Sequence, residues 1–147
     1  MRIAVLNGPN LNLLGIREPE RYGRTSLAEV ELRLAEVARE LDVELECTQH
    51  NGEGQLIDAV HRMRGRIDGA LVNAGAYSHT SLALRDALVG VDVPFVEVHV
   101  TNVYAREAER RHSMLAPAAL GGVIGLGTHG YELALRGLIS ALRGGSA

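Results

Sequence analysis

The chain contains no lysine, and all fifteen of its basic residues are arginine. Without a lysine amine, the protein cannot form a Schiff base with a carbonyl substrate. It also lacks the lysine that a P-loop uses to hold nucleotide phosphates. Two chemistries that are common in small α/β proteins are therefore excluded.

The chain also has little cysteine, no net positive charge and no long apolar run, and each of these excludes a class of protein. A single cysteine, Cys47, excludes a disulfide within the chain, and we expect it to fill a buried strand position. The net charge of −3 provides no basic surface for nucleic acid. No apolar run approaches the roughly 18 residues of a membrane-spanning helix, and the first residues do not resemble a secretory signal. We therefore expect a cytoplasmic protein that binds neither nucleic acid nor membranes.

Apolar runs alternate with helical patterns along the 147 residues. The predicted strands are residues 3–6, 43–47, 70–72, 94–98 and 122–124. The predicted helices are residues 26–41, 55–66, 81–89 and 131–142, with a short irregular or helical piece at 105–114. Strand–helix units in succession predict a parallel sheet with helices on both faces. We predict a single α/β domain, residues 1–147, with a doubly wound, five-stranded, flavodoxin-like sheet of order 2-1-3-4-5 and a flexible tail at about 144–147.

The connection between the first strand and the first helix is unusually long. Such a connection normally needs about 2–6 residues, whereas this one has roughly 17. Four large aliphatic side chains lie within residues 11–16, which is not typical of a disordered loop. Ser26 and Glu29 have the spacing of a capping box that starts the helix beyond it. We therefore predict an active-site lid at about residues 10–24, with three glycines as places where the backbone can turn.

Polar side chains gather at the carboxyl ends of the predicted strands, where open parallel sheets bind ligands. They are Asn7, Asn10, Gln49, Asn51, Asn73, Ser78, His79, Glu97, His99, Thr101, Asn102, Thr128 and His129. Turn chemistry explains a single asparagine at a strand end, but it does not explain asparagine at four ends and histidine at two. A polar and mostly neutral pocket with arginines nearby suits a small hydroxylated acid.

Two side chains are candidates for proton transfer. Tyr22 lies in the predicted lid five residues after Arg17, and nearby positive charge favours a phenolate that could remove a proton next to a carbonyl. His99 follows Glu97 by two residues on an extended chain, so the carboxylate can orient the imidazole. Ordinary packing is the alternative for both, and His79 could instead cap the third helix.

Two other kinds of site are not supported. No histidine pair has a metal-ligand spacing on one helix and there is no cysteine cluster, so no metal site is predicted. Residues 125–130 match the dinucleotide-binding pattern G-x-G-x-x-G, but only 17 residues follow them. That leaves no room for the acidic ribose partner about 20 residues further on. We predict that these glycines instead allow tight packing between the last strand and the last helix.

Taken together, these residues resemble the type II 3-dehydroquinate dehydratases, the type II dehydroquinases. The resemblance covers almost the whole chain in order. The matching segments are Gly8-Pro9-Asn10-Leu11-Asn12-Leu13-Leu14-Gly15 and Asn73-Ala74-Gly75-Ala76-Tyr77-Ser78-His79-Thr80-Ser81, with residues 17–19, 22–23, 53–54, 85–87, 97–99, 102–107, 110–113 and 125–127, and with Gln49 and Asn51.

The resemblance implies dehydration of 3-dehydroquinate to 3-dehydroshikimate by anti elimination through an enolate, in the shikimate pathway or in quinate catabolism. Tyr22 would remove the C2 proton, Arg17 would favour the ionised tyrosine and stabilise the developing charge, and Asn10 would help to hold the enolate. His99, oriented by Glu97, would protonate the leaving C1 hydroxyl.

The resemblance also implies a substrate-binding set and an assembly. The binding residues would be Asn73, His79 and Arg110 for the ring hydroxyls, and the backbone of Val100 and Thr101 for the carboxylate. The family forms a homododecamer, a tetramer of trimers, in which Asp86 would reach the site of a neighbouring subunit. No cofactor and no metal are implied.

Two positions depart from the family pattern. Serine is common where this chain has Thr101, and the extra methyl could crowd the substrate carboxylate. Serine is also common where His50 stands in the turn after the second strand. We expect both departures to affect affinity more than chemistry.

A flavodoxin-like binding or signalling module is the main alternative. A phosphoacceptor receiver would need acidic residues after the first strand and a lysine late in the chain, but Asn7 follows that strand and lysine is absent. A flavin carrier would favour aromatic residues around its ring system, but there is no tryptophan and only one phenylalanine. The residues favour the dehydratase over both.

Overall fold

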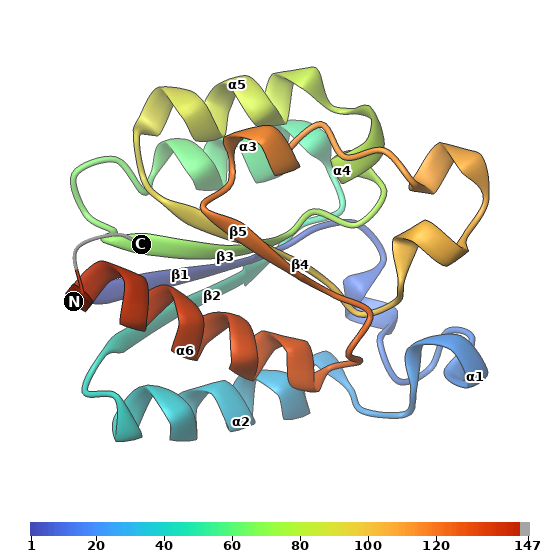
Figure 1. The fold of residues 1–147 in the computed structure, drawn as a ribbon, viewed down its shortest axis with the longest axis horizontal. Coiled ribbons are helices and arrows are strands. Elements are labelled where there is room, and N and C mark those ends of the chain that lie inside the picture. The colour runs from blue at the N-terminus through green and yellow to red at the C-terminus, as the bar shows by residue number, and fades with distance from the viewer. Residues whose placement is uncertain (145–147) are drawn as a thin grey trace.

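The computed structural model describes residues 1–144, which form a parallel sheet between two layers of helices (Figure 1). The five strands lie in the order β2-β1-β3-β4-β5. They are β1 (Arg2–Asn7), β2 (Glu44–Gln49), β3 (Gly69–Asn73), β4 (Phe95–His99) and β5 (Gly121–Ile124). All neighbouring pairs are parallel, so the predicted flavodoxin-like sheet is confirmed.

Helices cover both faces of the sheet, as the alternating pattern predicted. Helices α2 (Leu27–Glu40) and α6 (His129–Gly144) lie on one face, and α3 (Glu53–His61) and α5 (Leu82–Val91) on the other (Figure 1). Each layer packs its own apolar core against the sheet. Strands β3 and β4 are buried at every residue, because helices cover them on both sides.

The helix boundaries follow local chemistry. The Ser26 hydroxyl accepts a hydrogen bond from the Glu29 amide, and the Glu29 carboxylate accepts one from the Ser26 amide, both at 3.2 Å. The predicted capping box is thus confirmed. The prediction for residues 55–66 was wrong at its end, since α3 stops at His61. The chain then turns, and Gly65 takes a φ of 73°, a left-handed conformation that no α-helix continues through.

The long connection after β1 is not an irregular loop. It contains a 3₁₀ turn, η1 (Leu11–Leu13), and one short helix, α1 (Pro19–Tyr22). Leu14 anchors it, being 4% exposed and part of the core under α2 and α6. Its middle packs against its end at Gly15, where a Cβ would lie 2.8 Å from the carbonyl oxygen of Arg24.

The segment after β4 also consists of short turns rather than a helix. These turns are the 3₁₀ segments η2 (Val103–Ala105), η3 (Ala108–Arg110) and η4 (Ala116–Ala118). The fully buried Leu115 packs the segment against the core. Helix α4 (Tyr77–Thr80) follows β3 and precedes α5. The two segments, after β1 and after β4, approach each other at the carboxyl end of the sheet (Figure 1).

Among the glycines at residues 125–130, Gly130 shows the predicted packing between the last strand and the last helix, since a Cβ there would lie 3.3 Å from Val123 Cγ1. Gly125 donates its amide to the carbonyl of His99 at 3.0 Å, and Gly127 donates to Val100 at 3.0 Å. A Cβ on Gly125 would lie 3.0 Å from the Cβ of Asn102. These contacts hold the end of β4 in place.

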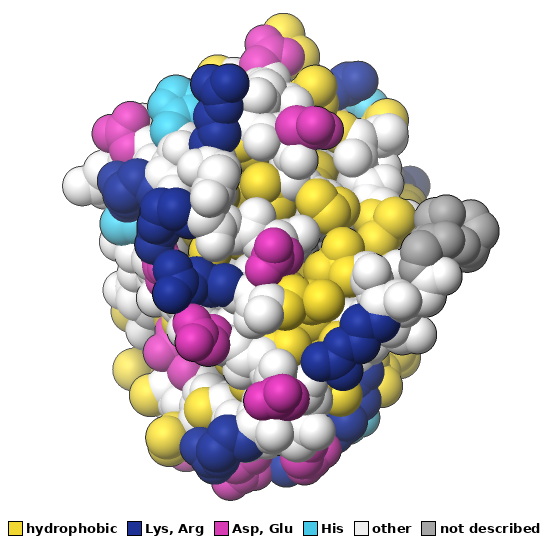
Figure 2. Space-filling view, turned by 90° about the vertical axis from the view of Figure 1, so that its left-hand side faces the viewer, with side chains coloured by type: hydrophobic (Ala, Val, Ile, Leu, Met, Phe, Trp, Pro, Cys, Tyr) yellow, Lys and Arg dark blue, Asp and Glu magenta, His cyan; other side chains and the backbone are white. Residues whose placement is uncertain are grey.

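Gly144 belongs to α6, so the predicted tail was wrong at its first residue, and the rest of that tail lies outside the described residues. Within the described part of the chain, no helix has both the length and the apolar character needed to cross a membrane. Figure 2 shows the end of the molecule away from the lid, where apolar side chains form a band bordered by charges of both signs.

Candidate active site

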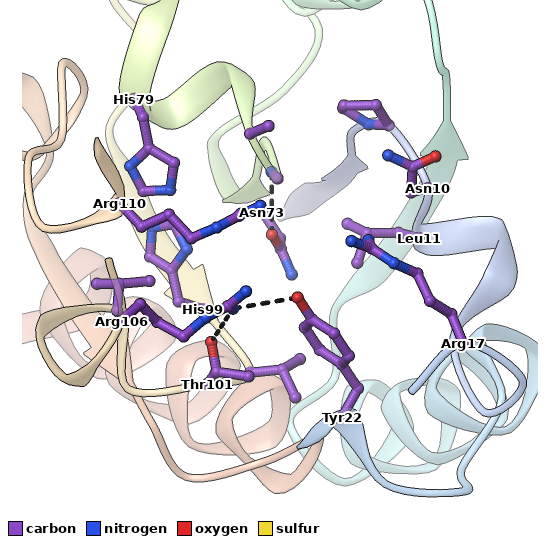
Figure 3. Close-up of a pocket in the computed structure, with 15 residues that line it drawn as sticks. Asn10, Leu11, Arg17, Tyr22, Asn73, His79, His99, Thr101, Arg106 and Arg110 are labelled. Atoms are coloured by element: carbon purple, nitrogen blue, oxygen red, sulfur yellow. Dashed lines mark hydrogen bonds between the residues drawn. The ribbon is translucent and has the colours of Figure 1, made fainter. Parts of the chain in front are cut away.

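A pocket lies between the carboxyl ends of β3 and β4 and the segment predicted as a lid (Figure 3). It is lined by Pro9, Asn10, Leu11, Arg17, Tyr22, Asn73, Gly75, Ala76, His79, His99, Val100, Thr101, Val103, Arg106 and Arg110. The structure thus brings together Asn10, Arg17, Tyr22, Asn73, His79, His99, Val100, Thr101 and Arg110 from the predicted set. Residues more than 90 positions apart in the sequence share this one pocket.

Two predicted site residues do not line the pocket. Glu97 is buried directly behind His99. Asp86 lies on α5 and lines a separate groove with residues of α3, including Ile57 and His61. Its side chain therefore belongs to the outer helical layer.

Other polar residues from the strand ends have supporting positions. Gln49 donates through its side-chain amide to the Gly8 carbonyl at 3.0 Å, and the Asn51 side-chain oxygen accepts the Asn10 amide at 3.0 Å. These bonds fix the start of the lid segment. Asn10 itself has a φ of 68°, which asparagine tolerates better than most residues.

The acid–base candidates on the sheet are buried together. His99 Nε2 lies 2.6 Å from Glu97 Oε1, and the two side chains are only 7% and 3% exposed. Both residues are on β4, two positions apart, so their side chains leave the strand on the same face. The expectation that Glu97 contacts His99 is confirmed. The same carboxylate oxygen lies 2.7 Å from the Ser113 hydroxyl.

His79 is held in one orientation beside this pair. Its Nδ1 lies 2.7 Å from the carbonyl oxygen of His112. A carbonyl can only accept, so Nδ1 carries the hydrogen and Nε2 is bare. The ring stacks on His99 with centroids 5.9 Å apart. Burial lowers the pKa of His79. The hydrogen bond to the His112 carbonyl opposes this shift, and the nearby His99 and Arg110 add to it.

The side chain of Asn73 is oriented by a network of hydrogen bonds between uncharged groups. Its Nδ2 donates to the Tyr131 hydroxyl at 2.8 Å, and that hydroxyl donates to Asn7 Oδ1 at 2.6 Å. Its Oδ1 accepts the amide of Gly75 at 3.2 Å. Burial raises the pKa of Tyr131 well above its usual range, so the phenol stays protonated. One amide hydrogen of Asn73 remains for a ligand.

The lid side of the pocket is built around Tyr22 and two arginines. The guanidinium of Arg17 lies 5.3 Å from the centre of the Tyr22 ring, and that of Arg106 lies 5.7 Å from it. Arg106 Nη1 also donates to the Tyr22 hydroxyl at 3.1 Å and to Thr101 Oγ1 at 3.3 Å (Figure 3). Two cations therefore face a phenol whose oxygen already accepts a hydrogen bond. Positive charge therefore lies on two sides of the Tyr22 side chain.

The sequence reasoning missed three residues that shape this site. Arg106 contacts Tyr22, Ser113 contacts Glu97, and Tyr131 contacts Asn73. Arg106 and Ser113 both fell within segments that resemble the dehydroquinases, which was the only available signal. Tyr131 had been interpreted as one apolar position of the last helix.

The arrangement suits proton transfer at two faces of one small molecule. Tyr22 can act as a base on the lid side, and His99 as an acid on the sheet side. Among residues 1–144, no three side chains of histidine, cysteine, aspartate or glutamate come together as metal ligands. The pocket offers amides, imidazoles and guanidinium groups, which suit a polyhydroxylated carboxylate.

A doubly wound parallel sheet with a polar pocket at the carboxyl ends of its strands is a small flavodoxin-like α/β enzyme fold. The sequence model of the family described as dehydroquinase class II matches residues 1–139. The chain therefore belongs to the class II dehydroquinase family.

Individual relatives agree along nearly the whole chain. The chain is 59% identical to a 3-dehydroquinate dehydratase of Gemmatimonas aurantiaca, over 97% of this chain and 93% of the relative. It is 53% identical to a catabolic 3-dehydroquinase of Aspergillus flavus, over 97% and 95%. The crystal structure of type II dehydroquinase from Butyrivibrio crossotus superposes with a TM-score of 0.91 at 41% identity, covering 94% of this chain and 97% of that one.

Proposed function

We propose that this protein dehydrates 3-dehydroquinate to 3-dehydroshikimate, a step shared by the shikimate pathway and quinate catabolism. The observation that carries the proposal is the facing arrangement of Tyr22, flanked by two guanidinium groups, and the buried His99–Glu97 pair. Family membership and the names of the relatives point to the same reaction.

The reaction begins with removal of a proton from C2 of the substrate, next to the C3 ketone. Tyr22 accepts this proton, and the electron pair moves into an enolate. Arg17 and Arg106 stabilise the negative charge on the tyrosine before the transfer. Asn10, at the lid end of the pocket, helps to hold the enolate, since an amide donates without acting as a competing base.

The second step breaks the C1–oxygen bond. His99 gives a proton to the C1 hydroxyl, which leaves as water, while the enolate electrons form the C1–C2 double bond. Glu97 orients the imidazole and balances its charge when it is protonated. The proton gained by Tyr22 and the proton lost by His99 are exchanged with solvent before the next turnover.

The remaining residues position the substrate. Asn73, His79 and Arg110 bind ring hydroxyls, and the backbone at Val100 and Thr101 binds the carboxylate. Support comes from their positions, because all five residues line the pocket that contains Tyr22. Asn73, His79 and Arg110 lie on the far side of it from Tyr22, and Thr101 lies beside Tyr22 (Figure 3). The lid, at about residues 10–24, closes over the substrate and excludes water.

The test is a direct assay of the purified protein with 3-dehydroquinate, following the ultraviolet absorbance of the conjugated enone product. The assay is repeated with borohydride and with a chelator. A rise in absorbance that neither additive changes is the expected result, because the mechanism uses neither an imine nor a metal. If the folded protein produces no rise in absorbance, the dehydratase function is refuted, and a flavodoxin-like binding module becomes the favoured alternative.

We also propose that the protein works as a cytoplasmic homododecamer, a tetramer of trimers. Helix α5 supports this, because Leu82, Asp86 and Val89 recur at helical spacing on one face and both apolar side chains are more than half exposed. Asp86 then reaches the pocket of a neighbouring subunit, since it lies away from its own.

Mixed assemblies test the role of Asp86. Asp86→Ala and Tyr22→Phe are each expected to be poorly active alone. Co-expression of the two chains should restore part of the activity, because some pockets then combine an intact Tyr22 with an intact Asp86 from a neighbour. A mixture that stays as inactive as its components, or wild-type protein that sediments as a monomer, would refute the intersubunit role.

A further inference from the structure

The hydroxyl of Ser113 occupies an unusual position behind the catalytic pair. Its oxygen lies 2.7 Å from Glu97 Oε1, 3.1 Å from the Leu115 amide nitrogen and 3.0 Å from the Ala116 amide nitrogen. Sequence reasoning and the dehydratase mechanism assign this serine no task. Ser113 thus links the backbone at Leu115 and Ala116 to the carboxylate that contacts His99.

Counting hydrogens decides the direction of these bonds. A serine hydroxyl has one hydrogen and two acceptor positions. The two backbone amides can only donate, so they occupy both acceptor positions of Ser113. Its single hydrogen is then directed to Glu97 Oε1. The serine is therefore a donor to the carboxylate.

The same oxygen of Glu97 is also in hydrogen-bond contact with His99. Nε2 of the imidazole lies 2.6 Å from Oε1, so Oε1 faces two neighbours, and one of them is a fixed donor. An ionised carboxylate only accepts hydrogen bonds, and the Ser113 hydroxyl, as a donor, favours the ionised form of Glu97. Beside that carboxylate the shared hydrogen belongs to His99 Nε2, and Nδ1 is left to load and release the catalytic proton.

His79 and His99 carry their hydrogen on different ring nitrogens, and two consecutive residues, His112 and Ser113, favour these two tautomers. The His112 carbonyl places the hydrogen of His79 on Nδ1, while Ser113, acting through Glu97, places the hydrogen of His99 on Nε2. The Met114 amide ties this stretch to the carbonyl of Ser78 at 2.7 Å. One short stretch thus touches the hydrogen-bond partners of both rings.

We propose that Ser113 is a positioning residue that holds Glu97 as a double acceptor and thereby fixes the Nε2–H tautomer of His99. The proposal rests on the dehydratase function, in which His99 delivers a proton to the leaving hydroxyl. Ser113 touches neither the substrate nor the reacting atoms. Its contribution is to keep Nδ1 as the nitrogen that donates this proton.

The experiment compares wild-type protein with Ser113→Ala in the intact assembly. Long-range ¹H–¹⁵N spectra of ¹⁵N-histidine-labelled protein report which ring nitrogen carries hydrogen. We expect one Nε2–H tautomer for His99 in the wild type and a mixed population in Ser113→Ala. His79 should keep its Nδ1–H signature in both proteins and serves as the control within the same spectrum.

Kinetics give the second readout. Removing a hydrogen bond to a charged group is expected to lower kcat about tenfold, with KM changed less than about twofold. The loss should largely vanish in a Glu97→Gln background, because the serine acts through that carboxylate. Ser26→Ala, which removes a helix cap far from the pocket, should leave kcat unchanged.

A purely structural role is distinguished by an isosteric pair. Ser113→Thr keeps the hydroxyl and should retain both the His99 tautomer and kcat, whereas Ser113→Val has nearly the same shape and should lose both. This pair also decides the question if Ser113→Ala fails to fold. Wild-type kcat and an unchanged His99 tautomer in Ser113→Val would overturn the proposal. Wild-type protein that does not turn over 3-dehydroquinate would refute the dehydratase function instead, and the tautomer spectra would still test the serine.

Discussion

The two walls of the pocket are built in different ways. The sheet wall carries His99, Asn73 and their partners on the ends of the central strands, where side chains are buried and bonds are 2.6–2.8 Å long. The lid wall carries Tyr22 on a four-residue helix, where Tyr22 contacts Arg106, the guanidinium of Arg17 over its ring, and the edge of the apolar core.

The exposure of the supporting groups explains the difference. On the lid, Arg17 pairs with Glu18 at 3.5 Å, and both side chains are about two-fifths exposed. Exposed ion pairs contribute little free energy, so the part of the lid around Tyr22 is held less firmly than the part anchored by Leu14. Buried hydrogen bonds are costly to leave unmade, so the sheet wall keeps its geometry. The proposed base is thus carried on the less firmly held wall, and the proposed acid on the more firmly held one.

The strongest way to break the lid wall is to remove its base. Tyr22→Phe should lower kcat by about a hundredfold to ten-thousandfold, the usual contribution of a positioned acid or base. Binding should persist, since the phenyl ring keeps its contacts with both arginines. Steady-state kinetics and calorimetry with 3-dehydroquinate measure the two effects. Tyr104→Phe, an exposed tyrosine outside the pocket, is the control, and near-normal turnover by Tyr22→Phe would contradict its role.

The next largest effect concerns the contact that fastens the lid to the rest of the site. Arg106→Gln removes hydrogen bonds to Tyr22 and Thr101, and we expect kcat/KM to fall about 10- to 100-fold. Arg21→Gln is the matched control, because Arg21 forms only an exposed ion pair with Glu18 at 3.8 Å within the described chain. Its effect should be less than about twofold. Equal losses in the two variants would mean that Arg106 acts through general charge rather than through its contacts.

Tyr131→Phe tests the sheet wall. It strips partners from Asn7 Oδ1 and Asn73 Nδ2, and each buried group left unpaired costs about 1–3 kcal/mol. We expect a lower free energy of unfolding and a higher KM, measured by denaturant titration at fixed protomer concentration and by steady-state kinetics. The same substitution at Tyr22 should leave stability nearly unchanged. If both tyrosines prove equally important for stability, the contrast between the walls is wrong.

The smallest expected effect is a pH dependence at His79. Its pKa is lowered in the folded state, mainly by burial, from an ordinary value near 6.5. The unfolded chain therefore binds this proton more readily, so the stabilising contribution is present above about pH 6.5 and is lost as the pH falls below it. His79→Gln should flatten the acid side of the stability curve. His61→Gln, at an exposed position on α3, should leave the slope as it is.

Much of the fold and site could be predicted from the sequence. Apolar periodicity located every strand, and the capping box at Ser26 located the start of α2. The strand-end rule identified Asn10, Asn73, His79, His99 and Thr101 among the pocket residues. Val100 and Arg110, and the specific roles in dehydration, came from the resemblance to a family. The spacing alone had indicated Tyr22 as a base and Glu97 as the partner of His99.

What could not be predicted depends on contacts between distant parts of the chain. Arg106 and Tyr22 are 84 residues apart, and Asn73 and Tyr131 are 58 apart. No local pattern reports such pairs. The predicted end of α3 was wrong because the chain turns after His61, and Gly65 then takes a left-handed conformation. The residues around Gly65 nevertheless continue a helical pattern in the sequence. The turns after β4 were left open because three short 3₁₀ pieces have no clear period.

The most direct test of the account follows exchange of the C2 hydrogen of 3-dehydroquinate with D₂O by NMR, in His99→Gln and in Tyr22→Phe. A base on the lid and an acid on the sheet predict that His99→Gln still exchanges this hydrogen while forming little product, because the enolate forms and returns. Tyr22→Phe should exchange it no faster than protein-free substrate does. Exchange in Tyr22→Phe as fast as in His99→Gln would show that another group is the base and would contradict the division of labour between the two walls.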